Sequence, residues 1–210
     1  MRLPEKLVFA TNNTHKLEEA RAIIGALASR TATQCRVLSL DEIGCHDDVE
    51  ETADTLEGNA LIKARWIAER YGLPCFADDT GLEVDALGGL PGVHTARFAA
   101  MDNPEATSHD STANMRLLLK RLEGKSNRKA AFRTAIALII DGDEHLFEGR
   151  VDGTIAESPC GKEGFGYDPV FIPDGFEESF AQMKPEMKNS LSHRGRALAA
   201  MMKNFQTSTI

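Results

Sequence analysis

Two adjacent carboxylates, Asp78 and Asp79, follow a short apolar run in the segment CFADDTGLEVDALGGLPG, residues 75–92. Asp, Thr and Gly all favour turns, so an ordinary turn is one explanation. The other is a metal and phosphate site, because Mg²⁺ is usually held by one or two carboxylates together with substrate phosphates. Neighbouring side chains of an extended segment point to opposite sides, so at most one aspartate faces a given ligand. Glu51 could supply the second carboxylate, or could only complement the dipole of the helix predicted after it.

Two lysines could supply positive charge for phosphate groups. Lys16 ends the polar loop TNNTHK at the start of a predicted helix, where loop amides and the helix N-terminus can hold an anion. The loop lacks the glycines of a P-loop. Lys63 lies four residues from both Asn59 and Ile67, which places these side chains on one helical face. For either lysine taken by itself, a surface lysine on a capped helix or a snorkelling lysine is the favoured alternative.

Two further stretches combine glycine, aromatic and basic residues. In EGFGYDPVF, glycines flank Phe165, so backbone amides and an aromatic face can approach a flat ligand; a tight turn is the alternative. In SLSHRGRALAAMMK, His193 and Arg194 begin a predicted helix, where the helix dipole disfavours cations. Such a local conflict is typical of functional sites, although an exposed, charged first turn also explains it.

The pattern of apolar residues predicts an α/β protein with a mixed central sheet flanked by helices. Strands are expected at residues 7–10, 36–40, 76–77, 82–86, 131–140, 146–151 and 170–172, and helices at residues 16–28, 54–70, 111–122 and 194–205. The expected helix caps are Asp54, Ser111 and Ser192. The dipeptide Asp141-Gly142 is expected to turn a hairpin, and residues 82–127 to form part of a smaller lobe.

Composition narrows the class of protein. The chain has 210 residues, of which 42% are hydrophobic, and a formal net charge of −8. These values suit one globular domain over residues 1–210 and argue against a nucleic-acid partner, which usually requires a basic excess. The four cysteines are scattered without a C-x-x-C pair, as expected for reduced thiols. Apolar runs are too short for a membrane span or a signal peptide, so we expect a cytoplasmic protein without a membrane partner.

In this order, the motifs resemble the inosine/xanthosine triphosphate pyrophosphatase family. The resemblance runs from residue 7 to residue 198 and rests on the segments TNNTHK, EETADTLEGNALIKA, ADDTGLEVDALGGLPGVHTARF, GFGYDPVF and SHRGRAL. Two positions depart from the family pattern: Asn12 stands where glycine is common, and Gly58 stands where glutamate is often found.

The resemblance implies an elongated, two-lobed α/β fold with a central cleft, usually a homodimer. It implies Mg²⁺-dependent hydrolysis of the deaminated purine nucleotides ITP, dITP and XTP to the monophosphate and pyrophosphate, which keeps them out of DNA and RNA. By matching position, the catalytic residues are Asp79, Lys16 and Lys63, and the metal ligands are Glu51 and Asp79. The substrate-binding residues are Thr11, Asn12, Asn13, Thr14, His15, Lys16, Thr80, Phe165, Gly166, Tyr167, Asp168, Lys188, His193 and Arg194.

Hydrogen-bond polarity suggests how such a site would select its substrate. Inosine and xanthosine carry a 6-keto acceptor, whereas adenine carries a 6-amino donor. A site that donates from Arg194 or from loop amides would therefore reject adenine.

Two other functions stay open on the sequence: a nucleotide-binding regulatory module without turnover, and a related pyrophosphatase for modified pyrimidines. Glu51 and Asp79 together favour an enzyme, because a sensor has less need of a metal with a water-activating carboxylate. Pyrophosphate release from a panel of nucleotides would separate the three.

Overall fold

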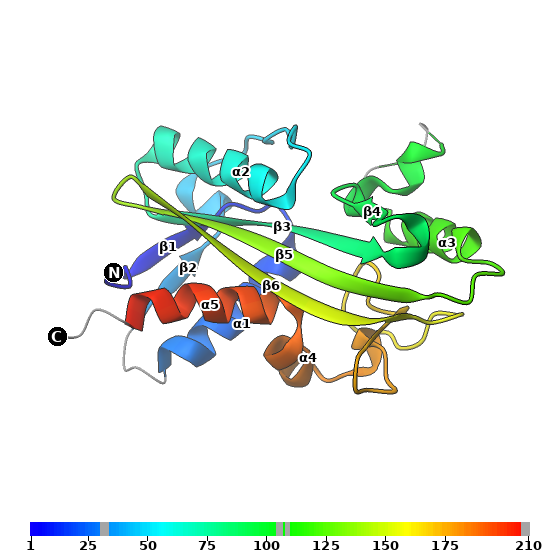
Figure 1. Cartoon of the computed structure of the whole chain (residues 1–210). Helices are drawn as coiled ribbons and strands as arrows, with labels where there is room; N and C mark the ends of the chain where they lie inside the picture. Colours follow the sequence, from blue (N-terminus) through cyan, green and yellow to red (C-terminus); the bar gives the residue numbers. More distant parts are fainter. Residues whose placement is uncertain (30–33, 104–106, 108–109, 207–210) are drawn as a thin grey trace. The chain divides into compact units, whose positions relative to one another are not determined.

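The computed structural model describes residues 1–29, 34–103, 107 and 110–206 (Figure 1). The chain divides into two compact units. The first unit consists of Met1–Asp79, Thr134–Gly149 and Ser192–Ile210, and the second of Thr80–Arg133 and Arg150–Leu191. The elements in chain order, with η for a 3₁₀ helix, are β1 (Lys6–Phe9), α1 (Thr14–Ser29), β2 (Arg36–Leu38), η1 (Asp41–Ile43), α2 (Leu56–Tyr71), β3 (Cys75–Val84), η2 (Asp85–Leu87), β4 (Pro91–Gly92), η3 (Thr95–Arg97), η4 (Ala99–Met101), α3 (Ser111–Arg121), β5 (Lys129–Ile140), β6 (Asp143–Ile155), β7 (Phe171–Pro173), η5 (Phe180–Gln182), α4 (Pro185–Leu191) and α5 (His193–Gln206).

The strands form a mixed sheet with the order β2-β1-β3-β5-β6-β7, and β4 pairs with β3. β1 pairs in parallel with both β2 and β3, and Val8 is aligned with Leu38 on one side and with Cys75 on the other. β4 is antiparallel to β3, and β7 is antiparallel to β6. The predicted α/β class with a mixed sheet is therefore confirmed, whereas the elongated shape and the central cleft stay predictions.

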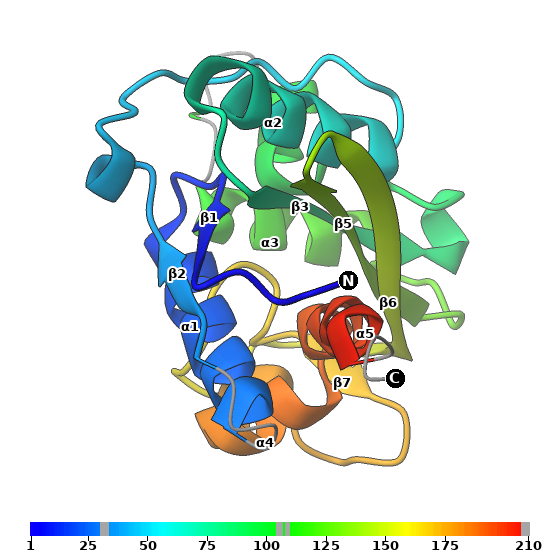
Figure 2. The same ribbon diagram turned by 90° about the vertical axis from the view of Figure 1, so that its left-hand side faces the viewer.

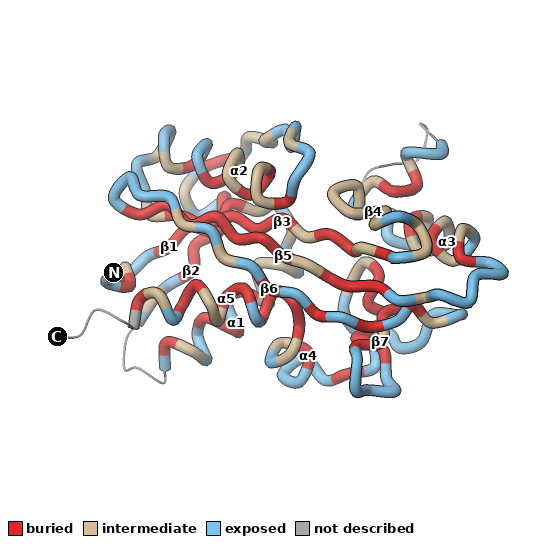
Figure 3. Tube along the Cα trace, in the orientation of Figure 1, coloured by how far each residue is buried: buried red, intermediate tan, exposed pale blue. Residues whose placement is uncertain are grey.

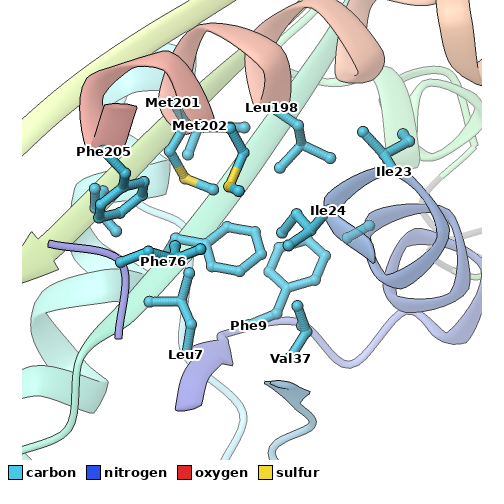
Figure 4. Packing of buried hydrophobic residues seen from close by; sticks show 14 of the residues in the cluster. Leu7, Phe9, Ile23, Ile24, Val37, Phe76, Leu198, Met201, Met202 and Phe205 are labelled. Atoms are coloured by element: carbon cyan, nitrogen blue, oxygen red, sulfur yellow. The ribbon is translucent and has the colours of Figure 1, made fainter. Parts of the chain in front are cut away.

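In the first unit, both faces of β1 and of the first half of β3 are buried. Side chains alternate across a strand, so Leu7, Phe9 and Phe76 enter one apolar cluster while Val8 and Cys75 enter another. Residues of α1 and α5 complete the first cluster (Figure 4), in which the rings of Phe9 and Phe76 stack with centroids 4.3 Å apart. Residues of α2 complete the second, and Figure 2 shows α2 on the opposite side of β1 and β3 from α1 and α5. This packing fixes three helices around β3.

The second unit has an apolar core of its own. Leu82 of β3 packs there with residues of α3 and with a group of aromatic rings. The ring centroid of Phe171 lies 4.7 Å from that of Phe132 and 5.2 Å from that of Phe180. Residues 82–127, which we expected in a smaller lobe, fall within this unit.

The prediction that a strand ends before Asp78 is wrong. β3 continues through both aspartates and the following Thr-Gly to Val84, as one strand instead of the two expected. Figure 3 shows that β3 is largely buried, and Asp78 and Asp79 are only 1% and 8% exposed. A turn would be favoured if these carboxylates sought solvent. Here they are satisfied by side chains of other elements, so the strand can run on.

Local signals for turns and caps were partly correct. The hairpin at Asp141-Gly142 is confirmed, with positive φ angles of 53° and 87°, as a two-residue hairpin turn of this kind requires. Ser192 caps α5, since its hydroxyl accepts a hydrogen bond from the amide of Gly195 at 3.1 Å. Two predicted caps are each wrong by one position: α2 is capped by Thr55 instead of Asp54, and α3 by Asp110 instead of Ser111. In each pair both residue types are good caps, and the structure shows which side chain bonds to the helix start.

Of the helices that the structure describes, none combines the length and the apolar character needed to cross a membrane.

Candidate functional site

Asp78 is the centre of a buried ion-pair cluster in the first unit. Its Oδ1 accepts a hydrogen bond from Lys16 Nζ at 2.8 Å, and its Oδ2 accepts one from Arg194 Nε at 2.9 Å. Burial by itself would raise the pKa of the Asp78 carboxyl, but the charges of Lys16, Arg194 and Lys63 outweigh burial and hold that pKa well below its ordinary value. Asp78 is therefore charged at neutral pH and pairs with cations from α1 and α5.

Glu19 also belongs to this cluster, although it was not among the predicted site residues. Arg194 is only 2% exposed, and its second contact is an ion pair between its terminal nitrogen and Glu19 Oε2 at 2.6 Å. Glu19 lies three residues after Lys16 on α1, a spacing that places both side chains on one helical face. This spacing was the only feature of the sequence that could have indicated Glu19 as a neighbour of Lys16. The alternative of an exposed first turn at Arg194 is wrong.

Asp79 points to the other side of β3 from Asp78, as strand alternation predicted. Its Oδ2 accepts a hydrogen bond from the amide nitrogen of Asn59 at 3.0 Å. Burial raises the pKa of Asp79 above its ordinary value, and the charges of Lys63 and Lys16 oppose this shift only in part. The two adjacent aspartates therefore differ: the pKa of Asp78 is held below the ordinary aspartate value, and that of Asp79 is held above it.

Lys63, on α2, contacts both Glu51 and β3. Its Nζ forms an ion pair with Glu51 and donates a hydrogen bond to the backbone oxygen of Asp78 at 2.8 Å. The side chain is 14% exposed, which does not match the snorkelling alternative. Burial by itself would lower the pKa of Lys63, but the carboxylates of Asp79, Glu51 and Asp78 hold it above its ordinary value. Lys63 thus stays charged where a phosphate group would need it.

The acidic side chains fit a metal that is shared with a phosphate ligand. Among the described residues, no group of three or more His, Cys, Asp and Glu side chains is placed to hold a metal ion by itself. Glu51 and Asp79 are close enough to interact electrostatically, and both act on Lys63. Mg²⁺ commonly takes one or two carboxylates and completes its coordination with water and substrate phosphates. The carboxylates of Glu51 and Asp79 therefore suit a Mg²⁺ ion whose other ligands are water and phosphate oxygens.

The loop TNNTHK caps α1, which begins at Thr14, two residues earlier than predicted. The side-chain oxygen of Asn13 accepts a hydrogen bond from the amide of Lys16 at 3.1 Å, and the hydroxyl of Thr11 accepts one from the amide of Asn13 at 3.2 Å. Asn12, Thr14 and His15 are exposed. The loop therefore presents polar side chains and the start of a helix beside Lys16.

His193 is buried at the start of α5, with 4% exposure. Its Nδ1 lies 2.6 Å from the hydroxyl oxygen of Thr134, on β5. No pattern in the sequence indicated Thr134, which is fully buried in an apolar strand. The contact fixes the imidazole ring against the sheet.

In the second unit, the GFGYDP loop is organised around Asp168. Its Oδ2 accepts hydrogen bonds from the amide of Phe165 and from Lys188 Nζ, both at 2.7 Å. Lys188 Nζ also lies 5.1 Å from the ring centroid of Phe165, a cation–π contact. Gly164 has a φ of +75°, and a Cβ there would lie 2.2 Å from Asp168 Oδ2, so this position requires glycine. These contacts order the loop and place one face of Phe165 against the buried ammonium group of Lys188.

Three other predicted site residues also belong to the second unit. Gly166 has a φ of +64°, which glycine adopts without strain. Tyr167 is buried in the core, and its hydroxyl donates to the backbone oxygen of Thr95 at 3.1 Å. Thr80 is half-buried on β3. The predicted residues thus divide into a cluster of cations and carboxylates in the first unit and an aromatic loop in the second.

Comparison with known proteins agrees with these features. Residues 7–204 match the model of the Ham1 family. A dITP/XTP pyrophosphatase of Porphyromonas gingivalis is 55% identical over 198 residues, which cover 94% of this chain and 95% of the relative. A HAM1 protein structure from Coxiella burnetii has a TM-score of 0.83 at 34% identity and covers 98% of this chain and 100% of its own. A nucleoside-triphosphatase, or dITP/XTP pyrophosphatase, from Mycobacterium abscessus has a TM-score of 0.70 at 41% identity and covers 93% of this chain and 98% of its own. The chain belongs to the Ham1 family.

Proposed function

We propose that this chain is a nucleoside triphosphate pyrophosphatase that hydrolyses ITP, dITP and XTP to the nucleoside monophosphate and pyrophosphate, and thereby cleanses the nucleotide pool. The substrate class is taken from the relatives named dITP/XTP pyrophosphatase. The observation that supports the chemistry best is the cluster in the first unit. Lys16 bonds there to the carboxylate of Asp78, and Lys63 bonds to the backbone oxygen of Asp78 and pairs with Glu51. A site with both signs of charge suits a ligand that carries phosphates and metal together.

The proposed mechanism gives the two aspartates different tasks. Asp79 takes the proton of the attacking water on a carboxylate oxygen, as a positioned general base does. Asp78 is unsuited to this task, because Lys16 and Arg194 each bond to one of its oxygens. Lys16 and Lys63 hold the phosphate oxygens and stabilise the charge that develops on the leaving pyrophosphate. Mg²⁺, when held by Glu51 and Asp79, supplies further positive charge beside the phosphates.

The aromatic loop of the second unit is the proposed site for the purine base. Phe165 offers a ring face on which a flat base can stack, and its backbone amide is oriented by Asp168. The positive φ of Gly166 turns the backbone beside that ring. Lys188 neutralises Asp168, so that the loop keeps its shape when a base excludes water from it.

The test of the proposed function is release of pyrophosphate from dITP, XTP, ITP, GTP, ATP and modified pyrimidine triphosphates, each with and without Mg²⁺. We expect turnover of the deaminated purines in the presence of Mg²⁺ and little turnover of ATP. Tight binding of dITP without release of pyrophosphate would instead indicate a regulatory module. A preference for pyrimidines would overturn the substrate class.

We further propose that the protein works in the cytoplasm as a homodimer. The family resemblance motivates both statements. Sedimentation equilibrium of the purified chain checks the second, and a mass near 22.9 kDa, that of one chain, would contradict it.

Lys16→Ala is expected to lower kcat/KM for dITP by roughly 10- to 100-fold, because a charge-assisted hydrogen bond to phosphate is lost. The measurement is steady-state kinetics with dITP. Lys6→Ala is the control, since Lys6 is an exposed lysine on β1 of the same unit. Unchanged kinetics in Lys16→Ala would show that this lysine serves only as a partner of Asp78.

Arg194→Met is expected to reduce the ratio of kcat/KM for ITP to that for ATP by roughly 10- to 100-fold, because a donor to the 6-keto oxygen is lost. A guanidinium carries five N–H donors, so its bonds to Asp78 and Glu19 are compatible with a bond to a ligand. Kinetics with ITP, GTP and ATP check the ratio, with Arg21→Met as the control at an exposed ion pair. An equal fall on all three substrates would assign Arg194 to the Asp78 cluster alone.

A further inference from the structure

The side chain of Asn59 links the segment that follows Glu51 to the carboxylate of Asp79 on β3. Its Oδ1 accepts a hydrogen bond from the backbone amide of Ala53 at 2.9 Å, and its Nδ2 donates to Asp79 Oδ2 at 3.0 Å. The amide orientation is determined by its partners, because a backbone N–H only donates and a carboxylate only accepts. Asn59 is 0% exposed, so each of these bonds would be costly to lose.

The segment that Asn59 holds is the one that carries Glu51. Ala53 lies two residues after Glu51 and is seated closely on the start of α2, where a Cβ on Gly58 would lie 2.6 Å from the Cβ of Ala53. Glycine at position 58 permits this close approach, because it has no Cβ. One helical turn later, Lys63 repeats the pattern of Asn59: it pairs with Glu51 and bonds to the backbone of Asp78. Two side chains of α2 therefore tie the Glu51 segment to β3.

We propose that Asn59 is a positioning residue that holds Asp79 and the Glu51 segment in one arrangement, so that the two carboxylates take up a divalent cation together. The inference rests on the proposed function for the identity of the cation. Its physical basis is that an amide of fixed orientation prevents the Asp79 carboxylate from rotating, and the same side chain prevents the Glu51 segment from moving away. Neighbours of this kind change metal affinity or activity by roughly 10- to 100-fold when removed.

A buried asparagine in the second unit provides a matched control. The Oδ1 of Asn114 accepts from the amide of Ala99 at 2.7 Å, and its Nδ2 donates to the backbone oxygen of Ala96 at 3.0 Å. Asn114 is 3% exposed. Both asparagines are thus buried and doubly bonded, but Asn114 joins backbone to backbone, whereas Asn59 joins backbone to a carboxylate.

The first experiment compares Asn59→Leu with Asn114→Leu. Each protein is saturated with a dITP analogue that has an imido group between the α and β phosphorus atoms, and Mn²⁺ is titrated by electron paramagnetic resonance. We expect the half-saturating Mn²⁺ concentration to rise roughly 10- to 100-fold in Asn59→Leu and to stay near the wild-type value in Asn114→Leu. Equal values in wild type and a folded Asn59→Leu would overturn the proposal, and so would equal rises in both variants.

The second experiment needs no variant and decides the case if Asn59→Leu does not fold. In the wild type with the same analogue, Mg²⁺ should shift the side-chain amide resonances of Asn59 and leave those of Asn114 in place. Unchanged Asn59 resonances would overturn the proposal. Failure of the proposed function looks different: the wild type would take up the metal and the analogue, yet release no pyrophosphate from dITP.

Discussion

Asp79→Asn is expected to leave the fold intact and to lower kcat on dITP by roughly 10²- to 10⁴-fold, the usual contribution of a positioned general base. The variant removes a negative charge that the proposed mechanism uses both for the metal and for the proton of water. The fold should tolerate the change, because the side chain keeps its size and an oxygen that can accept the hydrogen bond from Asn59. Stopped assays of pyrophosphate release, together with circular dichroism, give both measurements.

The matched control for Asp79→Asn is Glu83→Gln on the same strand. Glu83 belongs to the second unit, where it bonds to Arg133 at 3.0 Å and to Arg150 at 2.9 Å. Glu83→Gln, like Asp79→Asn, removes one carboxylate from β3, but Glu83 has no part in the proposed chemistry. Turnover of Glu83→Gln within about twofold of wild type is expected. Turnover of a folded Asp79→Asn close to the wild-type value would contradict the assignment of Asp79 as base.

Periodic patterns in the sequence predicted side-chain directions well. The alternation of a strand placed Asp78 and Asp79 on opposite sides, and the structure shows them with different partners. The spacing of four placed Asn59 and Lys63 on one face of α2, and both reach β3. These predictions succeeded because each depends on the geometry of a single element, which neighbouring residues determine.

Features that depend on distant residues could not be predicted. Asp78 and its partners Lys16 and Arg194 are 62 and 116 residues apart in the chain. Local turn preference at Asp-Asp-Thr-Gly ignores such partners, so the continuation of β3 through this segment was missed. The burial of Arg194 was missed for the same reason, because a guanidinium in the first turn of a helix is normally solvated unless carboxylates such as Glu19 are supplied by another element.

Asp78→Asn is expected to have the opposite profile to Asp79→Asn, with a loss of stability as its main effect. The free energy of unfolding should fall by about 3 kcal/mol or more, because removing one partner of a buried ion pair leaves the other charges uncompensated. Here the remaining charges are those of Lys16 and Arg194. Urea unfolding at pH 7 measures the change, and Asp79→Asn is the neighbouring control with a smaller expected loss. At a temperature where Asp78→Asn is folded, its kcat/KM should fall less than that of Asp79→Asn.

The pH dependence of stability separates loss of the charge from loss of packing. The pKa of Asp78 is lower in the folded chain than its ordinary value, so the folded state binds fewer protons there than the unfolded state. The stabilisation by Asp78 is therefore fully present above the ordinary aspartate pKa of about 3.9, and is lost as the pH falls from there toward the folded pKa.

The asparagine side chain of Asp78→Asn does not titrate. The gap in unfolding free energy between wild type and Asp78→Asn should thus be constant between about pH 7 and pH 5 and narrow below about pH 4. Urea unfolding of both proteins across this range gives the gap directly, and other carboxylates cancel in the difference. A gap that stays constant down to pH 3 would show that Asn fails at this position by its shape or hydrogen bonding, and that the charge of Asp78 does not hold Lys16 and Arg194 in place.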